Sequence, residues 1–339
     1  MPTMIDVAKR AGVAVSTVSY AINGTRPISE ETRQRIFAAM EDLDYKPNAL
    51  ARGLAGKRSR IIALLCAAPD RGLGFTELGF ITSAADTARE NEYNLLLWSL
   101  DANQTDELRQ LIQQGLADGV IVMEVHLHDE RVDLLNELEF PFSIIGRCDD
   151  LQNHGYVDID FHQTAYDAVR YLIELGHTQI ALINQSQRQF EAGYGPAVRM
   201  QHGFEAVMHS YDLPILTRFC PVTPQEGYRV CCELVAENPD LTSMVVMNER
   251  AIPGIIQAIT EYGWRIPEDF SLLSLVSSPN VAQMSIPPLT SLDSPNTELG
   301  RLGAEQLIQQ LEAVADHPPP RKLLPCYLNV RGSTGPARA

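Results

Sequence analysis

Polar and charged side chains stand at the ends of several short apolar runs, where they could bind a small molecule. Glu124 directly follows the run GVIVM, Asn248 ends the run MVVMN, and Glu249 follows it. If these runs are parallel strands, such side chains lie at the carboxyl ends of the strands, where open sheets bind ligands. A solvated loop is an equal alternative for any one of them. The same placement adds three further candidates, Phe75, Thr76 and Asp160.

Other groupings of reactive side chains are weaker. Glu124, His126, His128 and Asp129 could hold a metal ion, but a His-x-His pair after a strand is more typical of a loop. No Ser/His/Asp or Cys/His arrangement has a supporting motif, and no glycine-rich phosphate loop is present. The six cysteines lack C-x-x-C spacing and read as reduced core residues. We therefore expect no catalytic residue, no metal and no cofactor.

The elements that would position these side chains alternate between strands and helices from Ile61 onward. Seven runs read as buried parallel strands: IIALL, NLLLW, GVIVM, FSIIG, IALIN, MVVMN and FSLLSL. Amphipathic stretches between them read as helices, at residues 78–88, 108–116, 165–173 and 252–259. This alternation predicts an α/β fold with doubly wound sheets. So many units favour two lobes with a ligand cleft between them.

The first sixty residues differ and read as three short helices. Thr3 and Asp6 form a capping-box pattern before a helix over residues 4–11, which Gly12 ends. A second helix spans residues 15–23, and a third runs from Ser29 to Leu43. This segment is an all-α head on the α/β core.

Three residues of the head have the types and spacing of a helix-turn-helix. Ala8 is small enough for two helices to cross closely, Gly12 tolerates a positive φ in the turn, and Val18 packs between the helices. The pattern indicates DNA binding. A helical hairpin without a DNA role is the alternative.

Charge supports the same division. The chain of 339 residues has a net charge of −16, yet residues 1–60 carry +4 and the remainder carries −20. A basic head on an acidic body presents only one end to phosphate.

Seven stretches in order resemble the LacI/GalR (lactose repressor) family: DVAKRAGVAVSTVSYAING, SEETRQRI, YKPNALARGLAGKRS, LGHTQIALI, IPEDFSLL, PPLTSLD and VRGSTGP. The resemblance covers essentially the whole chain. It implies a helix-turn-helix, a hinge helix, and a periplasmic-binding-protein-like core that dimerises and binds an effector.

The resemblance also implies DNA-binding residues. Val15, Ser16 and Tyr20 would face the major groove, and phosphate contacts would come from Thr3, Thr17, Ser19, Asn23 and Thr32. Tyr20 departs from the arginine often found there, so the half-site should differ at that base pair. Ala14 replaces the usual serine, which removes a cap.

The hinge helix of the family corresponds to residues 47–54. Asn48 would cap it, Ala51 would allow two copies to approach closely, and Leu54 would wedge between base pairs in the minor groove. Gly53 weakens so short a helix, so we expect it to fold only on DNA. An ordinary linker is the alternative for Leu54.

Three departures concern the effector cleft. Glu249 stands where the family commonly has aspartate, and Val276 replaces the aspartate that would grip sugar hydroxyls. The family arginine position is Met200, and the nearby arginine is Arg199. A sugar or glycoside remains the expected effector, although the residues do not identify it.

The predicted domains are residues 1–46 (helix-turn-helix), 47–60 (hinge and linker), 61–160 with 290–322 (first lobe), and 161–289 with 323–339 (second lobe). We expect a cytoplasmic transcriptional regulator, a repressor, that binds a palindromic double-stranded DNA operator as a homodimer. No apolar run approaches the ~20 residues of a membrane helix, and the N-terminus lacks the centre of a signal peptide. The alternative is a two-lobed solute-binding protein or enzyme without operator function.

Overall fold

The computed structural model describes residues 2–23, 26–45, 58–66, 72–100, 103–150, 154–312 and 320–338. The chain forms two compact units, Met1–Ile61 with Gln110–Asp118, and Ile62–Arg109 with Gly119–Ala339. No helix in the described part of the chain combines the length and the apolar character that crossing a bilayer requires.

The head of the first unit contains three helices, as predicted: α1 (Met4–Ala11), α2 (Val15–Asn23) and α3 (Glu30–Asp42). Thr3 and Asp6 form the expected capping box, and Ser29 caps α3 from outside. A small apolar cluster joins the helices, with Val7, Val18 and Ile36 fully buried. In the same unit Asp118 accepts hydrogen bonds from the backbone N–H groups of Ser59 and Arg60.

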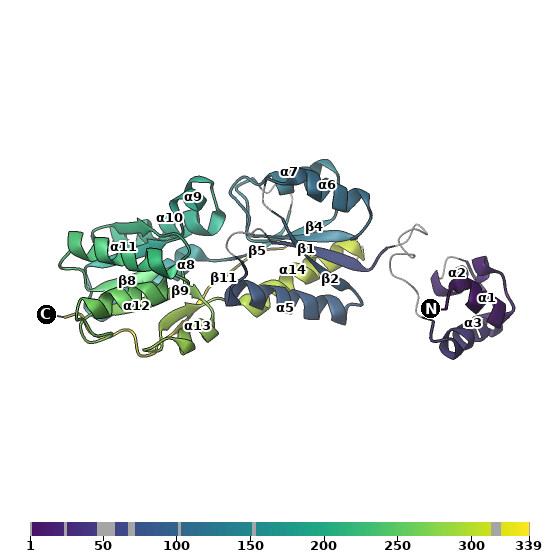
Figure 1. Ribbon diagram of the computed structural model, residues 1–339. Helices are drawn as coiled ribbons and strands as arrows, with labels where there is room; N and C mark the ends of the chain where they lie inside the picture. The colour runs from purple at the N-terminus through teal and green to yellow at the C-terminus, as the bar shows by residue number, and fades with distance from the viewer. Residues whose placement is uncertain are drawn as a thin grey trace. The chain divides into compact units, whose positions relative to one another are not determined.

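The second unit contains two six-stranded sheets, each flanked by helices (Figure 1). The first sheet has the order β11-β5-β4-β3-β1-β2, and the second has the order β12-β10-β9-β8-β6-β7. We call the sheets with their helices the first and second lobes. The α/β fold with doubly wound lobes is therefore confirmed.

The first lobe comprises β1 (Ile61–Cys66), α5 (Phe75–Glu90), β2 (Asn94–Ser99), α6 (Thr105–Gln113), β3 (Gly119–Met123), α7 (Glu130–Glu137), β4 (Phe142–Ile145), β5 (Tyr156–Ile159), α14 (Asn296–Leu311) and β11 (Arg321–Leu324). The second comprises α8 (Phe161–Glu174), β6 (Ile180–Asn184), α9 (Gln187–Glu191), α10 (Gly195–Ser210), β7 (Leu216–Phe219), α11 (Pro224–Glu237), β8 (Ser243–Val246), α12 (Ile252–Glu261), β9 (Ser271–Ser277), α13 (Pro279–Met284), β10 (Thr290–Asp293) and β12 (Tyr327–Asn329).

Parallel pairing joins β1 to β3, β3 to β4, and β6 to both β7 and β8. Ile62 is opposite Gly119, and Ile180 is opposite Ser243. β12 instead pairs antiparallel with β10. All seven predicted strands exist, but NLLLW was wrongly predicted to be buried, because β2 ends the sheet and is only half covered.

One predicted boundary between the lobes is wrong in detail. Residues 290–293 were assigned to the first lobe, yet β10 pairs with β9 in the second sheet. Leu323 and Leu324, assigned to the second lobe, belong to β11, which pairs with β5 in the first sheet. The chain changes sheets after β5, after β10 and again after β11.

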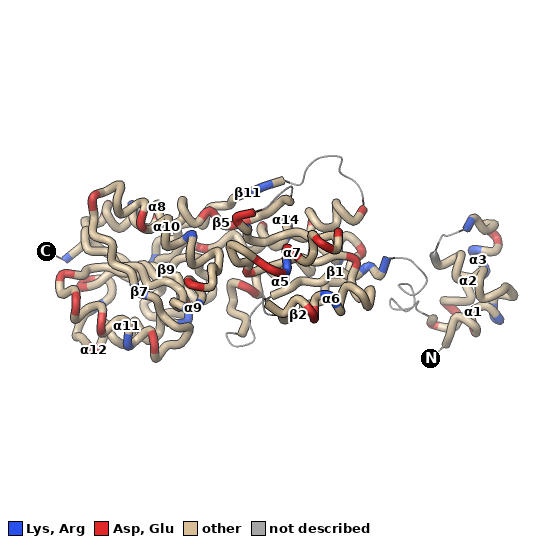
Figure 2. The backbone as a smooth tube through the Cα atoms, turned by 90° about the horizontal axis from the view of Figure 1, so that it is seen from above, with Lys and Arg blue, Asp and Glu red and all other residues tan. Residues whose placement is uncertain are grey.

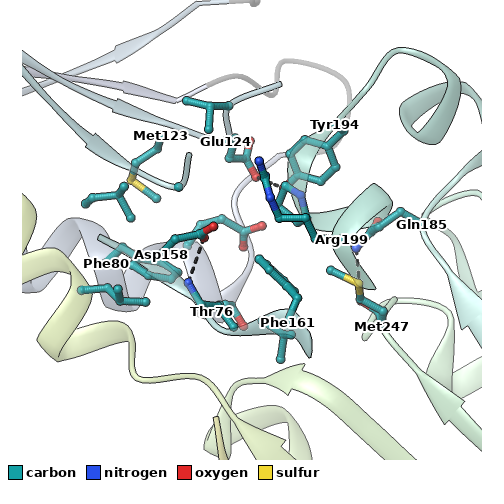
Figure 3. A pocket seen from close by; sticks show the side chains of 18 of the residues that line it. Thr76, Phe80, Met123, Glu124, Asp158, Phe161, Gln185, Tyr194, Arg199 and Met247 are labelled. Atoms are coloured by element: carbon teal, nitrogen blue, oxygen red, sulfur yellow. Dashed lines mark hydrogen bonds between the residues drawn. The ribbon is translucent and has the colours of Figure 1, made fainter. Parts of the chain in front are cut away.

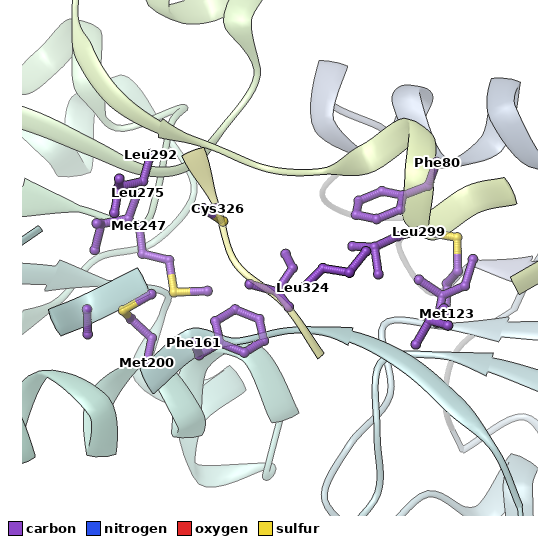
Figure 4. Close-up of a cluster of buried hydrophobic side chains, with 14 of the residues drawn as sticks. Phe80, Met123, Phe161, Met200, Met247, Leu275, Leu292, Leu299, Leu324 and Cys326 are labelled. Carbon is purple, nitrogen blue, oxygen red and sulfur yellow. The ribbon is translucent and has the colours of Figure 1, made fainter. Parts of the chain in front are cut away.

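A single apolar cluster continues from one sheet to the other through these connections. Figure 4 shows Phe161 and Leu324 between Met200 and Leu275 on one side and Phe80 on the other. Five of the six cysteines are buried and all six are free, as expected of core thiols. Shared packing of this kind holds both lobes close enough to line one cavity.

Candidate functional site

The helix-turn-helix geometry of the head agrees with the sequence pattern. Ala8 and Val18 are buried where α1 and α2 meet. Gly12 has a φ of 66°, and its N–H donates to the carbonyls of Ala8 and Lys9. A glycine suits this position because its backbone lies in the left-handed region.

The predicted groove-facing side chains lie on one exposed helix. Val15 and Ser16 are exposed at the start of α2, and Tyr20 is half-buried further along it. The guanidinium carbon of Arg26 lies 5.2 Å from the centroid of the Tyr20 ring, at cation–π distance. The face of α2 therefore offers a hydroxyl, an aromatic ring and a cation to a ligand.

The predicted phosphate-binding residues fall into two groups. Thr3 and Thr32 already take part in helix caps: Thr3 bonds to Asp6, and the Thr32 hydroxyl accepts from Ser29. Thr17 and Ser19 are half-buried on α2. Four predicted positions lie outside the described residues or have undescribed side chains: Asn23, Asn48, Ala51 and Leu54.

Figure 2 shows basic and acidic residues side by side on the head helices, and residues of both signs on the two lobes. On α1 the basic residues are Lys9 and Arg10 in the last turn, where the helix dipole stabilises positive charge.

A cavity lies between the two lobes. Its empty volume is about 940 Å³, which includes the part that opens to solvent. Its wall combines apolar side chains, including Phe80, Met123 and Met247, with charged ones from both lobes. Figure 3 shows Glu124, Tyr194 and Arg199 grouped together, with Asp158 beside the same space. Apolar walls with a few converging polar groups are typical of small-molecule sites.

Five of the seven predicted effector residues line this cavity: Thr76, Glu124, Arg199, Asn248 and Glu249. Phe75 instead lines a separate surface hollow with Leu73 and Leu78. Asp160 caps α8, where its side chain accepts from the N–H of Gln163, and does not line the cavity. Phe75 and Asp160 were predicted to bind the effector, but they do not line the cavity.

Several contacts join the lobes across the cavity. The Thr76 hydroxyl donates to Glu249, and the Tyr194 hydroxyl donates to Glu124, both at 3.4 Å. The Arg199 guanidinium donates to Asp149 at 3.2 Å. These contacts link the angle between the lobes to groups that a ligand would touch.

Asn248 and Glu249 differ in what they offer a ligand. The amide of Asn248 donates to the carbonyl of Cys220 at 2.8 Å, so this side chain fixes a loop of the second lobe. Burial raises the pKa of Glu249, against hydrogen bonds from Ser278 and Thr76 that lower it. Both of these hydrogen bonds are long, at 3.4 Å. Glu249 is the better candidate to bind a ligand.

Backbone strain marks two cavity residues. Glu124 has a φ of 52° and Val276 a φ of 50°, and both lie in the left-handed region. That conformation is costly for a β-branched residue such as valine. Strained positions cluster at functional sites, and here one lies on each lobe.

Sequence reasoning missed Arg147, Asp158, Gln185 and Tyr194, which also line the cavity. Arg147 follows the short strand β4, and Asp158 lies on the short strand β5. The Arg147 Nε lies 3.4 Å from the Asp158 carboxylate. For these four residues the sequence offers one signal: in the run GRC, Arg147 places a cation just after the predicted strand FSIIG.

Asp129 and His126, considered above as possible metal ligands, instead form hydrogen bonds within the first lobe. Asp129 forms a fully buried ion pair with Arg131, at 2.7 and 2.9 Å, and Arg131 also donates to the backbone carbonyl of Glu124. Despite burial, the hydrogen bonds from Arg131 and His126 hold the pKa of Asp129 well below its ordinary value. Asp129 therefore anchors the end of β3. Among the described residues, no three His, Cys, Asp or Glu side chains are grouped so that they could hold a metal ion.

Two families match the chain. Residues 3–48 match bacterial regulatory proteins, lacI family, and residues 169–334 match a periplasmic binding protein-like domain. Among curated relatives, the HTH-type transcriptional regulator AscG of Escherichia coli (strain K12) is 31% identical, covering 95% of each chain. The HTH-type transcriptional repressor PurR of Klebsiella pneumoniae (strain 342) is 30% identical, covering 92% of this chain and 91% of that protein.

Solved structures agree with this match. A transcriptional regulator CelR–cellobiose complex is 26% identical with a TM-score of 0.74, covering 98% of this chain and 100% of that one. The Lac repressor dimer bound to operator and the anti-inducer ONPF has a TM-score of 0.83 at 24% identity, covering 98% and 99%. The second likeness establishes the shared fold.

Proposed function

The chain belongs to the lacI family of bacterial regulatory proteins, and we propose that it is a homodimeric repressor whose affinity for a palindromic operator changes when a carbohydrate occupies the cleft. Since one head covers half of a palindromic site, two copies are needed to read it. Such a regulator acts on the chromosome in the cytoplasm.

The geometry of the head carries this proposal. Gly12 turns the chain between two helices packed through Ala8 and Val18, while Val15 and Ser16 stay exposed on α2. A second helix with an uncovered first turn is the part of a helix-turn-helix that enters the major groove. We assign base contacts to Val15, Ser16 and Tyr20.

The phosphate and hinge residues remain part of the proposal. Thr3, Thr17, Ser19, Asn23 and Thr32 would hold the head on the backbone, and Asn48, Ala51 and Leu54 would bind the minor groove.

The cleft supports the carbohydrate part. Its contacts between lobes, Thr76 with Glu249 and Tyr194 with Glu124, involve side chains that a ligand would engage. A ligand that replaces them changes the angle between the lobes, and reciprocity requires operator and ligand to alter each other's affinity equally. The similar CelR was solved with cellobiose.

The test uses the full chain and a library of random DNA duplexes. Selection should enrich two inverted copies of one half-site, and a thermal-shift screen of neutral sugars and glycosides should then find a compound that alters binding to that duplex. Enrichment of no sequence, or of a sequence without inverted symmetry, would refute the operator proposal. If none of the compounds that bind the protein alters its affinity for the duplex, the proposal of effector control is refuted.

A further inference from the structure

Asp158 is a buried carboxyl group inside the cleft. It lies on β5 with 5% of its surface exposed and lines the cavity. One carboxylate oxygen, Oδ1, accepts a hydrogen bond from the N–H of Ile159 at 2.8 Å. The other, Oδ2, is buried and has no hydrogen-bond donor among the described residues. A buried acceptor left without a donor is costly, and each such atom calls for an explanation.

The groups around Asp158 define which donors are compatible with Oδ2. The Arg147 Nε lies 3.4 Å from Oδ2 but makes no hydrogen bond to it. Arg199, from α10 of the second lobe, also acts on the carboxylate through its charge. Arg199 lines the same cavity and is itself mostly buried.

These neighbours discriminate between ligand classes. An ammonium group at Asp158 would lie against two guanidinium groups, and an anionic group would lie against the carboxylate. A neutral hydroxyl fits both, since it donates to the carboxylate and accepts from an arginine. Two adjacent hydroxyls could serve Asp158 and Arg147 together.

The rest of the cavity favours a ligand with an apolar face. Phe80 and Met123 line it from the first lobe, and Phe161, Met247 and Val276 line it from the second. A sugar ring has hydroxyls at its edge and C–H groups on its faces, so it suits a wall of this composition.

We propose that Asp158 is an effector-binding residue, which accepts a hydrogen bond through Oδ2 from a hydroxyl of a neutral polyhydroxyl ligand whose neighbouring oxygen is held by Arg147. This inference rests on the proposed function, because it names the chemical class that the cleft binds. It places the main polar recognition on the first lobe, at the ends of β4 and β5.

Binding should depend on pH. Burial raises the pKa of Asp158 to about 7, against the opposing effects of Arg199 and Arg147. The other groups facing it are Asp160 and Cys326, and burial raises the pKa of the Cys326 thiol to about 12. Because the ionised carboxylate is the stronger acceptor, affinity should rise between pH 6 and pH 8, by up to about tenfold.

The experiment measures binding of cellobiose, ribose and other neutral mono- and disaccharides to the full chain by calorimetry at pH 6 and pH 8. Sugar phosphates and amino sugars form the charged arms. We expect a neutral sugar to bind, more tightly at pH 8. Asp158→Asn should weaken that binding about tenfold or more at pH 8 and remove its pH dependence. Glu249→Gln, which changes another buried carboxyl of the cavity, should weaken binding but keep the pH dependence.

Asp160→Asn is the matched control, since it makes the same change two residues away, outside the cavity, and asparagine still caps α8. It should bind like the parent at pH 8 and no more weakly than the parent at pH 6, because the Asp160 charge raises the pKa of Asp158. Equal binding by Asp158→Asn, affinity that falls as pH rises, or binding of charged sugars alone would overturn the inference. Each result leaves the DNA selection unaffected, so failure here is distinct from failure of the proposed regulator.

Discussion

The head and the two-lobed core are stabilised in different ways. The head has a small apolar cluster of alanines, two valines and Ile36, helix caps, and an ion pair between Arg10 and Asp42 that faces solvent. The core buries charge outright: Asp129 and Arg131 are fully enclosed, and Asp158 lies in the cavity wall. Charge removed from water is costly unless it is paired.

The location of the buried charges suggests why the core retains them. Arg131 holds the carbonyl of Glu124, and Asp158 faces the cavity, so both act where a ligand would bind. A buried polar network fixes the directions of its side chains. The head meets a highly charged partner at its surface, where exposed side chains suffice. Variants of both regions test this difference.

The largest effect is expected from Arg131→Ala. This change leaves Asp129 buried without its partner, which typically costs about 3–5 kcal/mol. Urea unfolding followed by the fluorescence of Trp98 in the first lobe and Trp264 in the second, both partly buried, measures the loss. The double variant Asp129→Leu, Arg131→Met should recover much of it, because no unpaired charge remains. A mild loss in the single variant would show that water reaches this pair.

Asp158→Asn should stabilise the core at high pH. The pKa of Asp158 is raised from 3.8 to about 7, so the folded state binds this proton more tightly than the unfolded state. The contribution of this carboxyl group to the free energy of unfolding is therefore fully present below pH 3.8 and is lost as the pH rises toward 7. The ligand-free variant should melt a few degrees higher at pH 8, on the order of 2 kcal/mol; the difference should be smaller at pH 5 and should vanish below pH 3.8. A lower melting temperature at pH 8 would mean that Arg147 compensates the buried charge fully.

The two regions also differ in how far the sequence predicts them. Gly12, the Thr3–Asp6 cap and the ends of α1 and α2 follow from neighbours within a few residues, and all are as predicted. The sequence pattern does not single out Asp158, because β5 is only four residues long and the strand-end rule points to Asp160, which follows it. Tyr194 faces Glu124 only because two lobes meet, and no local pattern encodes that contact.

Gly12→Val should weaken the head by about 1–2 kcal/mol, since a β-branched residue at a φ of 66° is strained. A Cβ there would meet no atom within 4 Å, so the cost is purely conformational. DNA affinity for the selected duplex should fall while sugar binding is unchanged. Gly263→Val is the matched control, with a φ of 82° and equally open space, but in the second lobe. If both variants lose DNA affinity equally, the head does not fold as a separate unit.

The smallest effect is expected from Arg10→Ala. The Arg10 guanidinium lies 2.7 Å from Asp42, and it joins α1 to α3, yet the two side chains are 60% and 54% exposed. Water screens such a pair, and holding two long side chains in place costs entropy, so exposed pairs contribute about 0.2–1 kcal/mol. Hydrogen exchange of the head amides, without DNA, measures the change, and 0.5 M salt should remove most of it, since the screening length then falls to roughly 4 Å. If Arg10→Ala instead costs as much as Arg131→Ala and resists salt, exposure is not what separates the electrostatics of the head from those of the core.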